Sequence, residues 1–471
     1  MVRIGAVHKS FQAGTLLTVV SVLLWTSCGG MSNGPGATLT PIPRGSTPIV
    51  VSITDSPSDR VVSFELTIDS ITLTATDGST VVLSNSSHRV EVTHLSGSAE
   101  PLLLTSIPQG TYTAAKVVVS KPDVAFIDDS GHEIEKNDVA ATQTINITLN
   151  PPLVVANTPV VLTVDFNAAG SIDINLATGT VTVNAEAEAH HDEVPGGSQQ
   201  DGEDVDNGEL EHVIGQVSGV SGAAFTVSDN VGGTTITFVT DGNTKFEDGA
   251  TLASLVNAMV RVEAETQQNG QPLAKEIELL NMNGSEAEGL ITATTGSPVT
   301  SFTVVVHDGS GLGMTDSMLG TTLTLNVNDQ TRFRVDAGDI QLGGLNLPDF
   351  NASSLSKGQR VEADAENSVT EDHSSDQGGT GGAVESVKLE RQALTGTVSN
   401  PSNSQFTLTL ADDSAFKLLT GVGTLTVLMQ QNTDVKDIAV SSGANVRVRG
   451  LLFFDPNSGS LTMVAGRISA P

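Results

Sequence analysis

Aromatic side chains are scarce in this chain of 471 residues. There is one tyrosine, Tyr112, and one tryptophan, Trp25, so any core must be built from Val, Ile, Leu, Phe and Ala. After the first 30 residues, Val, Thr and Ile recur between glycine-containing turns, and no segment has sustained helical periodicity. These features predict an all-β protein made of short strands joined by tight turns.

Basic side chains are also few. The chain has 22 Lys and Arg against 54 Asp and Glu, and its formal net charge is -32. Such a balance keeps a protein soluble and repels phosphate backbones. We therefore predict no nucleic-acid partner.

Known catalytic patterns are missing from the sequence. It has no Gly-x-Ser-x-Gly elbow, no His-Glu-x-x-His pair and no phosphate loop ending in Gly-Lys-Ser or Gly-Lys-Thr. The glycine-rich run 309–313 has Met314 where a dinucleotide loop needs its third glycine. We predict no catalytic residues, no cofactor and no enzymatic activity.

The lone cysteine, Cys28, closes a short apolar run that begins at Leu16 and follows Arg3 and Lys9. A basic start, an apolar middle and small residues before the cut predict a signal peptide at residues 1–27. This ending resembles the bacterial lipoprotein signal, in which the cysteine is lipidated. The resemblance implies an exported protein held by a lipid anchor in the bacterial cell envelope, on the periplasmic face of the outer membrane or on the cell surface. The alternative is an ordinary signal peptide followed by a free cysteine.

Composition divides the rest of the chain into segments. We predict a flexible tether, a β-sandwich, an acidic linker and three small β-barrels, at 28–48, 49–189, 190–212, 213–284, 285–392 and 393–471 respectively.

The sandwich prediction rests on alternation. Phe64, Leu66 and Ile68 fall on one face of a strand within 61–74. Thr54–Pro57, Ile107–Thr113 and Gly179–Val183 resemble a bacterial lipoprotein family known as domain of unknown function 4382. The resemblance implies a prealbumin-like or immunoglobulin-like sandwich, and the family has no established activity. We expect Tyr112 to pack its ring in the core while its hydroxyl reaches a backbone group.

An internal repeat predicts the barrels. Each unit has an opening with glycine and aliphatic residues, a Phe-Thr strand, a further threonine and a strand with arginine beside valine. These positions are Gly215, Gly289 and Gly396; Phe225, Phe302 and Phe406; Thr244, Thr331 and, in the third unit, Thr433; and Arg261, Arg360 and Arg447. The pattern resembles domain of unknown function 5666, a small β-barrel repeat related in shape to the oligonucleotide/oligosaccharide-binding (OB) fold. Five or so short strands per unit can close into such OB-like barrels.

The repeated arginines and the linker are the polar features to weigh. Arg261, Arg360 and Arg447 could line a shared groove, but strand alternation favours side chains that face solvent, opposite the neighbouring valines. The linker residues that could bind a cation weakly are His190, His191, Asp201, Asp204, Asp206 and His212. Because the spacing of 204–208 does not fit a calcium loop, the favoured interpretation is a spacer that a protease cuts first, leaving two stable halves.

Together these features predict a lipid-anchored cell-envelope protein with a structural or binding role. Its partners would be the membrane and an envelope polysaccharide or protein. The alternative function is a carbohydrate- or cell-surface-ligand-binding protein that uses the barrels, although its phenylalanines lie mostly at core-like positions.

Overall fold

The computed structural model describes residues 45–56, 58–95, 99–193, 209–229, 235–247, 249–267, 271–280, 285–311, 314, 316–338, 340–365, 379–436 and 438–471. The predicted signal peptide, most of the tether and the candidate lipidation residue Cys28 lie outside these residues. Among the described residues, no helix has the length and apolar character that a bilayer span requires.

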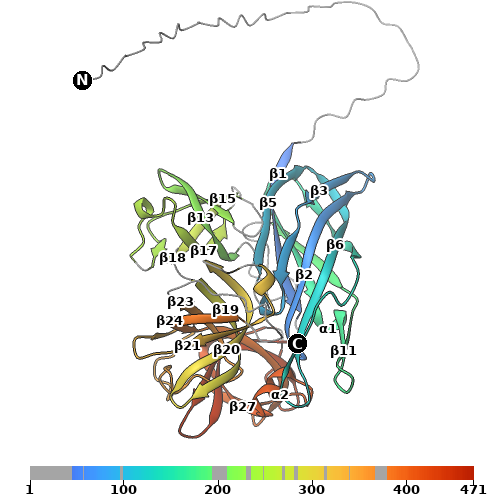
Figure 1. Ribbon diagram of the computed structural model, residues 1–471. Helices are drawn as coiled ribbons and strands as arrows, with labels where there is room; N and C mark the ends of the chain where they lie inside the picture. Colours follow the sequence, from blue (N-terminus) through green and yellow to red (C-terminus); the bar gives the residue numbers. More distant parts are fainter. Residues whose placement is uncertain are drawn as a thin grey trace, which may run out of the picture. The chain divides into compact units, whose positions relative to one another are not determined.

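The N-terminal domain, residues 45–193, is a sandwich of two sheets (Figure 1). The first sheet has β1 at its centre, parallel to β9 and antiparallel to β5, and β12 lies beyond β9. Its strands are β12 (Ala187–Glu193), β9 (Val160–Asn167), β1 (Ser46–Ser56) and β5 (Glu100–Pro108).

The second sheet is built on two long antiparallel strands, β2 and β6. Its strands are β3 (Thr80–Ser84), β2 (Val61–Ala75), β4 (His88–Glu91), β6 (Gly110–Ile127), β7 (Glu133–Lys136) and β8 (Gln143–Val155). Two short elements complete the domain: helix α1 (Ala168–Ser171) and the hairpin of β10 (Ile172–Asn175) and β11 (Thr180–Val183). The all-β sandwich prediction is confirmed.

Apolar side chains from both sheets form one core between them. Phe64, Leu66 and Ile68 on β2 are all fully buried, as their alternation predicted. Tyr112 is buried as well, and its hydroxyl donates a 2.7 Å hydrogen bond to the carbonyl oxygen of Pro108. The predicted structural role of this tyrosine is therefore confirmed.

Three small barrels follow the sandwich in the chain. Barrel 1 (209–280) and barrel 2 (285–389) are six-stranded sheets that close by an extra parallel pairing, β15 with β18 and β21 with β24. Their strands are β13 (Glu209–Ser221), β14 (Ala224–Asp229), β15 (Thr235–Val239), β16 (Lys245–Phe246), β17 (Met259–Thr266), β18 (Pro272–Leu280), β19 (Ser285–Gly296), β20 (Val299–Gly311), β21 (Thr322–Asn326), β22 (Arg332–Val335), β23 (Arg360–Ala365) and β24 (Gly379–Leu389).

Barrel 3 (391–469) closes with five strands, because the single strand β27 takes the place of two separate strands in barrels 1 and 2. Its strands are β25 (Arg391–Ser399), β26 (Gln405–Thr409), β27 (Thr424–Val435), β28 (Asn445–Asp455) and β29 (Ser460–Ser469). Helix α2 (Ala415–Thr420) connects β26 to β27. The prediction of several closed small barrels is confirmed.

The repeated glycines mark a close approach of two backbones. A Cβ at Gly215, Gly289 or Gly396 would overlap a carbonyl oxygen of the next strand. Because only glycine lacks that carbon, each barrel carries it at the same place in its first strand.

The acidic segment differs from the predicted spacer at both ends. Residues 190–193 belong to β12, which pairs with β9, and residues 209–212 begin β13, which pairs with β17. A strand's backbone hydrogen bonds do not depend on the charge of its side chains, so acidic composition did not exclude pairing here. Residues 194–208 lie outside the described part.

The sandwich and the barrels also share apolar clusters. Val50 and Val161 of the sandwich belong to the cluster that contains the core of barrel 1. A second cluster joins Val62 and Ile127 to Val305 of barrel 2 and to residues of α2. Since each half buries apolar side chains against the other, the structure does not support the expectation that the halves fold separately.

Candidate functional site

The residues predicted to bind a cation in the linker do not come together in the described structure. His191 Nε2 lies 2.8 Å from the carbonyl oxygen of Pro151, and His190 lies 4.0 Å from Glu188 on the same strand. Asp201, Asp204 and Asp206 lie outside the described residues, as does the side chain of His212. The histidines of β12 therefore contact their own domain.

The solvent-facing prediction for two of the repeated arginines is wrong. Arg261 is 5% exposed and Arg360 is 8% exposed, whereas Arg447 is half-buried. Alternation does direct these side chains away from the barrel interior, where Val262 and Val361 are fully buried. However, the outer face of β17 and β23 is covered by neighbouring modules, and the sequence of one repeat unit does not record this.

Arg261 joins barrel 1 to barrel 2. Its guanidinium lies 3.0 Å from Glu278 on β18 of its own barrel and 2.8 Å from Glu362 on β23. It also forms an ion pair with Glu286 on β19. Burial lowers the pKa of Arg261, but these carboxylates outweigh that effect and raise the pKa well above its usual range. The guanidinium thus remains charged between the two barrels.

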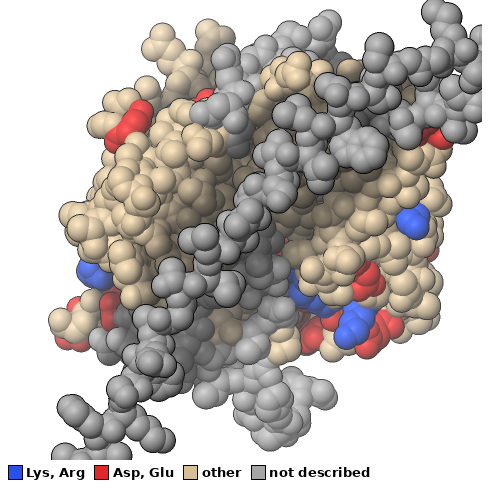
Figure 2. All heavy atoms as spheres, turned by 90° about the horizontal axis from the view of Figure 1, so that it is seen from above, with Lys and Arg blue, Asp and Glu red and all other residues tan. Residues whose placement is uncertain are grey.

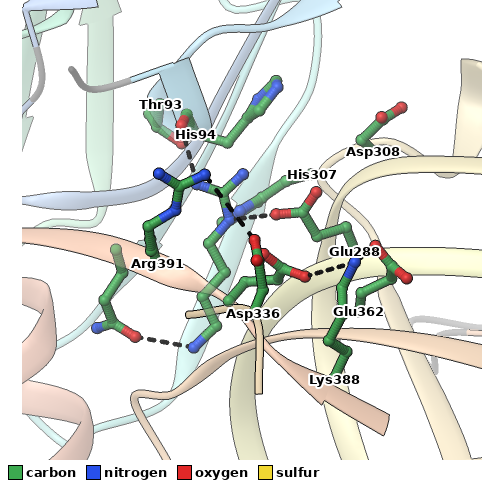
Figure 3. Close-up of polar contacts among 12 residues, drawn as sticks. Thr93, His94, Glu288, His307, Asp308, Asp336, Glu362, Lys388 and Arg391 are labelled. Carbon is green, nitrogen blue, oxygen red and sulfur yellow. Dashed lines mark hydrogen bonds and ion pairs between the residues drawn. The ribbon is translucent and has the colours of Figure 1, made fainter. Parts of the chain in front are cut away.

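Arg360 joins barrel 2 to the sandwich. It forms an ion pair with Glu288 and donates a 2.9 Å hydrogen bond to the carbonyl oxygen of His94. Residue His94 belongs to the short 3-10 helix η1 (Thr93–Leu95), which follows β4. Figure 3 shows His94 and His307 near Glu288, which projects from barrel 2.

His94 is held between two carboxylates. Its Nδ1 lies 2.9 Å from Glu91 and its Nε2 lies 2.8 Å from Glu100. Burial lowers the pKa of His94, but Glu100 and Glu91 reverse this and raise the pKa well above its usual value. Because both ring nitrogens face carboxylates, the imidazole is charged and donates on both sides.

His307 is neutral. Its Nε2 donates a 2.7 Å hydrogen bond to the carbonyl oxygen of Val62, and Nδ1 has no hydrogen-bond partner among the described residues. Burial lowers the pKa of His307 below its usual value. The rings of His307 and His94 stack with centroids 6.4 Å apart. This pair is a second polar contact between barrel 2 and the sandwich.

The outer face of barrel 2 carries a further group of charged side chains. Lys388 on β24 lies 3.0 Å from Glu362 and 3.2 Å from Glu390. Figure 3 shows Lys388 and Glu362 beside each other on this barrel. Oxygens of Glu286, Glu362 and Asp364 lie within 4.8 Å of one another, so these three residues could hold a cation. Carboxylate oxygens suit hard ions such as calcium.

Sequence reasoning missed this face of barrel 2. In the sequence, this face is marked by an acidic residue at every second position with alanine between, as in 286–288 and 362–364. Ala287 and Ala363 point into the barrel and are buried. Alternation of acid and small apolar residues was compatible with a solvated outer face, so burial of the acids required knowledge of the neighbouring modules.

The sandwich and the first barrel match two family models. Residues 46–183 match the model described as "Domain of unknown function (DUF4382)", and residues 214–278 match "Domain of unknown function (DUF5666)". Both resemblances drawn from the sequence motifs are therefore confirmed. A search of curated proteins finds no match to the sequence. These comparisons identify domains and assign no activity.

Two solved structures are similar over part of the chain. One is a multidomain protein with nucleic acid binding domains from Streptococcus pneumoniae, 11% identical, with the match covering 54% of this chain and 72% of that one, at a TM-score of 0.11. The other is Drosophila Unr CSD456, 11% identical, covering 54% of this chain and 94% of that one, at a TM-score of 0.13. Similarity this low carries no argument about function.

Proposed function

We propose that the protein is an exported, lipid-anchored, non-enzymatic component of the bacterial cell envelope with a structural role, in which a sandwich and three barrels act as one joined assembly. The observation that carries the proposal is the use of buried polar groups between modules. Arg360 and His307 join barrel 2 to backbone carbonyls of the sandwich, and Arg261 joins barrel 1 to barrel 2.

This use of charge suits a structural role better than a catalytic one. A general acid or base must reach a substrate proton, whereas the carboxylates of Glu288 and Glu362 are buried and face arginine or lysine. Removing one partner of a buried ion pair is strongly unfavourable, so these contacts hold the modules together.

Two surface features bear on partners. On the face that Figure 2 shows, the visible basic side chains lie close to acidic ones, and uncharged atoms separate these groups. Phe225, Phe302 and Phe406 are each 1% exposed, so these rings cannot stack on a sugar. Both observations favour an envelope-protein partner over nucleic acid, and over the alternative of carbohydrate binding by the barrels.

The anchor is tested by mass spectrometry of the protein purified from its native membrane. We expect a chain that begins at Cys28 and carries added lipid, and we expect Cys28→Ser to appear in the soluble fraction. Cleavage elsewhere without lipid would contradict the anchor.

The structural role is tested on intact cells. In-cell chemical cross-linking of the unaltered chain should capture envelope proteins, and Arg360→Ala should weaken that capture because the assembly loosens. A glycan screen on the purified chain is the matched experiment. Specific, saturable glycan binding without protein cross-links would instead favour the carbohydrate-binding alternative.

A further inference from the structure

The outer face of barrel 2 places like charges directly opposite one another. Glu286 on β19 is the register partner of Asp364 on β23, and Glu288 is the partner of Glu362. Residues two apart in a strand share a face, so these four carboxyl groups form one patch. Like charges opposite each other across strands are unfavourable, and burial increases that cost.

The cations in this patch are fewer than the carboxyl groups. Glu288 pairs with Arg360, toward the sandwich. Among the described residues, the other three carboxyl groups and their neighbours Glu278 and Glu390 share two cations, Arg261 and Lys388. An excess of buried negative charge must be balanced by protons or by a further cation.

One carboxylate oxygen of the patch has no partner among the described residues. Glu286 is 5% exposed, and its Oε1 forms the ion pair with Arg261. Its other oxygen, Oε2, is buried and accepts no hydrogen bond from any described residue. The carboxyl group points into the patch, because one of its oxygens lies within 4.8 Å of oxygens of Glu362 and Asp364. A buried carboxylate oxygen without a partner is a position that a cation or a proton can satisfy.

The geometry fits a calcium ion. Calcium binds oxygens at about 2.4 Å, so two ligands on opposite sides of the ion are about 4.8 Å apart. Three oxygens that all lie within 4.8 Å of one another are close enough to bind one ion after small side-chain movements. The ligands are carboxylates alone, which favours a hard cation over zinc or copper. Arg261 can keep its contact with Glu286 Oε1 while Oε2 binds the ion.

We propose that Glu286, Glu362 and Asp364 form a calcium site on the face of barrel 2 that Arg261 of barrel 1 covers. The bound ion supplies the positive charge that the patch lacks and gives Glu286 Oε2 a partner. Because Arg261 contacts two of the three ligands, the bound ion lies at the junction of the two barrels.

The test uses the purified full chain after metal removal with EDTA. Isothermal titration with calcium chloride should show one strong site per chain, and calcium should raise the thermal unfolding temperature. E286Q and D364N should each weaken calcium binding about tenfold or more, because each removes a charged ligand. The matched control is E278Q, which removes a carboxylate that pairs with Arg261 but is not one of the three ligands. Its affinity for calcium should stay close to that of the unaltered chain.

Two outcomes would overturn the site. If the metal-free chain binds no calcium at millimolar concentration, protons balance the patch. If binding persists in E286Q and D364N but is lost when Asp201, Asp204 and Asp206 become Asn, the ion binds the acidic segment instead. Should E286Q fail to fold, D364N decides alone, since Asp364 is only half-buried and Asn can still accept the Ser386 hydrogen bond.

Discussion

The interiors of barrels 2 and 3 are built alike, but their outer faces differ. In barrel 2, Val361 pairs with Leu389, and in barrel 3 Val448 pairs with Ile468; all four side chains are fully buried. The outward positions beside them carry different charges. They are Arg360, Glu362, Lys388 and Glu390 in barrel 2, and Arg447, Arg449, Arg467 and Ser469 in barrel 3.

Burial differs at the first two of these positions. Arg360 is buried against the sandwich and Glu362 is buried against barrel 1. In barrel 3, Arg449 and Arg467 are half-buried, and Arg467 pairs with Asp434 of its own barrel. The comparison teaches that the repeat specifies the buried interior of each barrel, while the outer face depends on what packs against it.

The largest expected effect comes from the arginine position itself. Arg360→Ala removes the ion pair of Glu288 and leaves the His94 carbonyl without that donor, so we expect a loss of about 3–5 kcal/mol in the free energy of unfolding. Arg447→Ala, at the matched position of barrel 3, should cost about 1 kcal/mol, because Arg447 is half-buried. Urea unfolding of both variants measures the difference. Equal costs would show that the outer faces are equivalent.

The next effect is the pH dependence of the free energy of unfolding, which arises from buried groups at and near the sandwich–barrel 2 junction. Burial raises the pKa of Glu65 to about 8, against the lowering effect of Arg89. A raised folded pKa means that the folded state holds the proton more tightly, so stability falls as pH rises from about 4.3 to about 8. His94 acts in the same direction, because its stabilisation is complete below about pH 6.5 and is lost as pH rises through its raised pKa.

Two groups limit stability on the acid side. Burial raises the pKa of Glu91, but the neighbouring histidines and Thr93 reverse this and lower it to about 2, so its contribution is lost as pH falls toward 2. His307, with a lowered pKa, resists the charge that it would gain below about pH 6.5. We expect maximal stability near pH 5–6.5 and a loss of about 1–3 kcal/mol by pH 8.5. Urea midpoints across pH measure this, and Glu65→Gln should flatten the alkaline fall; an unchanged slope would contradict the role of Glu65.

Sequence reasoning succeeded where a single strand or a single repeat unit contains all the information. Strand alternation predicted the buried face of β2 at Phe64, and the repeated glycines predicted equivalent first strands in the barrels. It failed at Arg261 and Arg360, because their surroundings come from modules distant in the sequence.

The histidine pair shows the same limit. His94 and His307 are more than 200 residues apart in the chain, and each looked like an isolated histidine. Only the packing of η1 against barrel 2 brings their rings together. Glu91, three residues before His94, was a local signal, but nothing in that spacing indicated that Glu100 would close the other side.

The smallest expected effect tests whether a threonine hydroxyl stabilises barrel 3 as it does barrel 2. Thr331 Oγ1 donates to the Val384 carbonyl at 2.8 Å and accepts from the Asn328 amide at 3.1 Å. Thr433 makes the same two bonds, to the Ala465 carbonyl at 2.8 Å and from the Gln430 amide at 2.7 Å, within the register shift of β27. Its predicted equivalence is confirmed.

Thr331→Val and Thr433→Val each keep the shape of the side chain but remove both bonds, so each should cost about 1 kcal/mol in urea unfolding. Thr→Ser at the same positions keeps the hydroxyl and serves as the control. Similar costs at Thr331 and Thr433 would mean that these threonine hydrogen bonds stabilise both barrels equally, whatever lies on the outer face. A cost at Thr331 with none at Thr433 would instead mean that the continuous β27 strand holds barrel 3 closed without this threonine, and the difference between the barrels would then extend to their interiors.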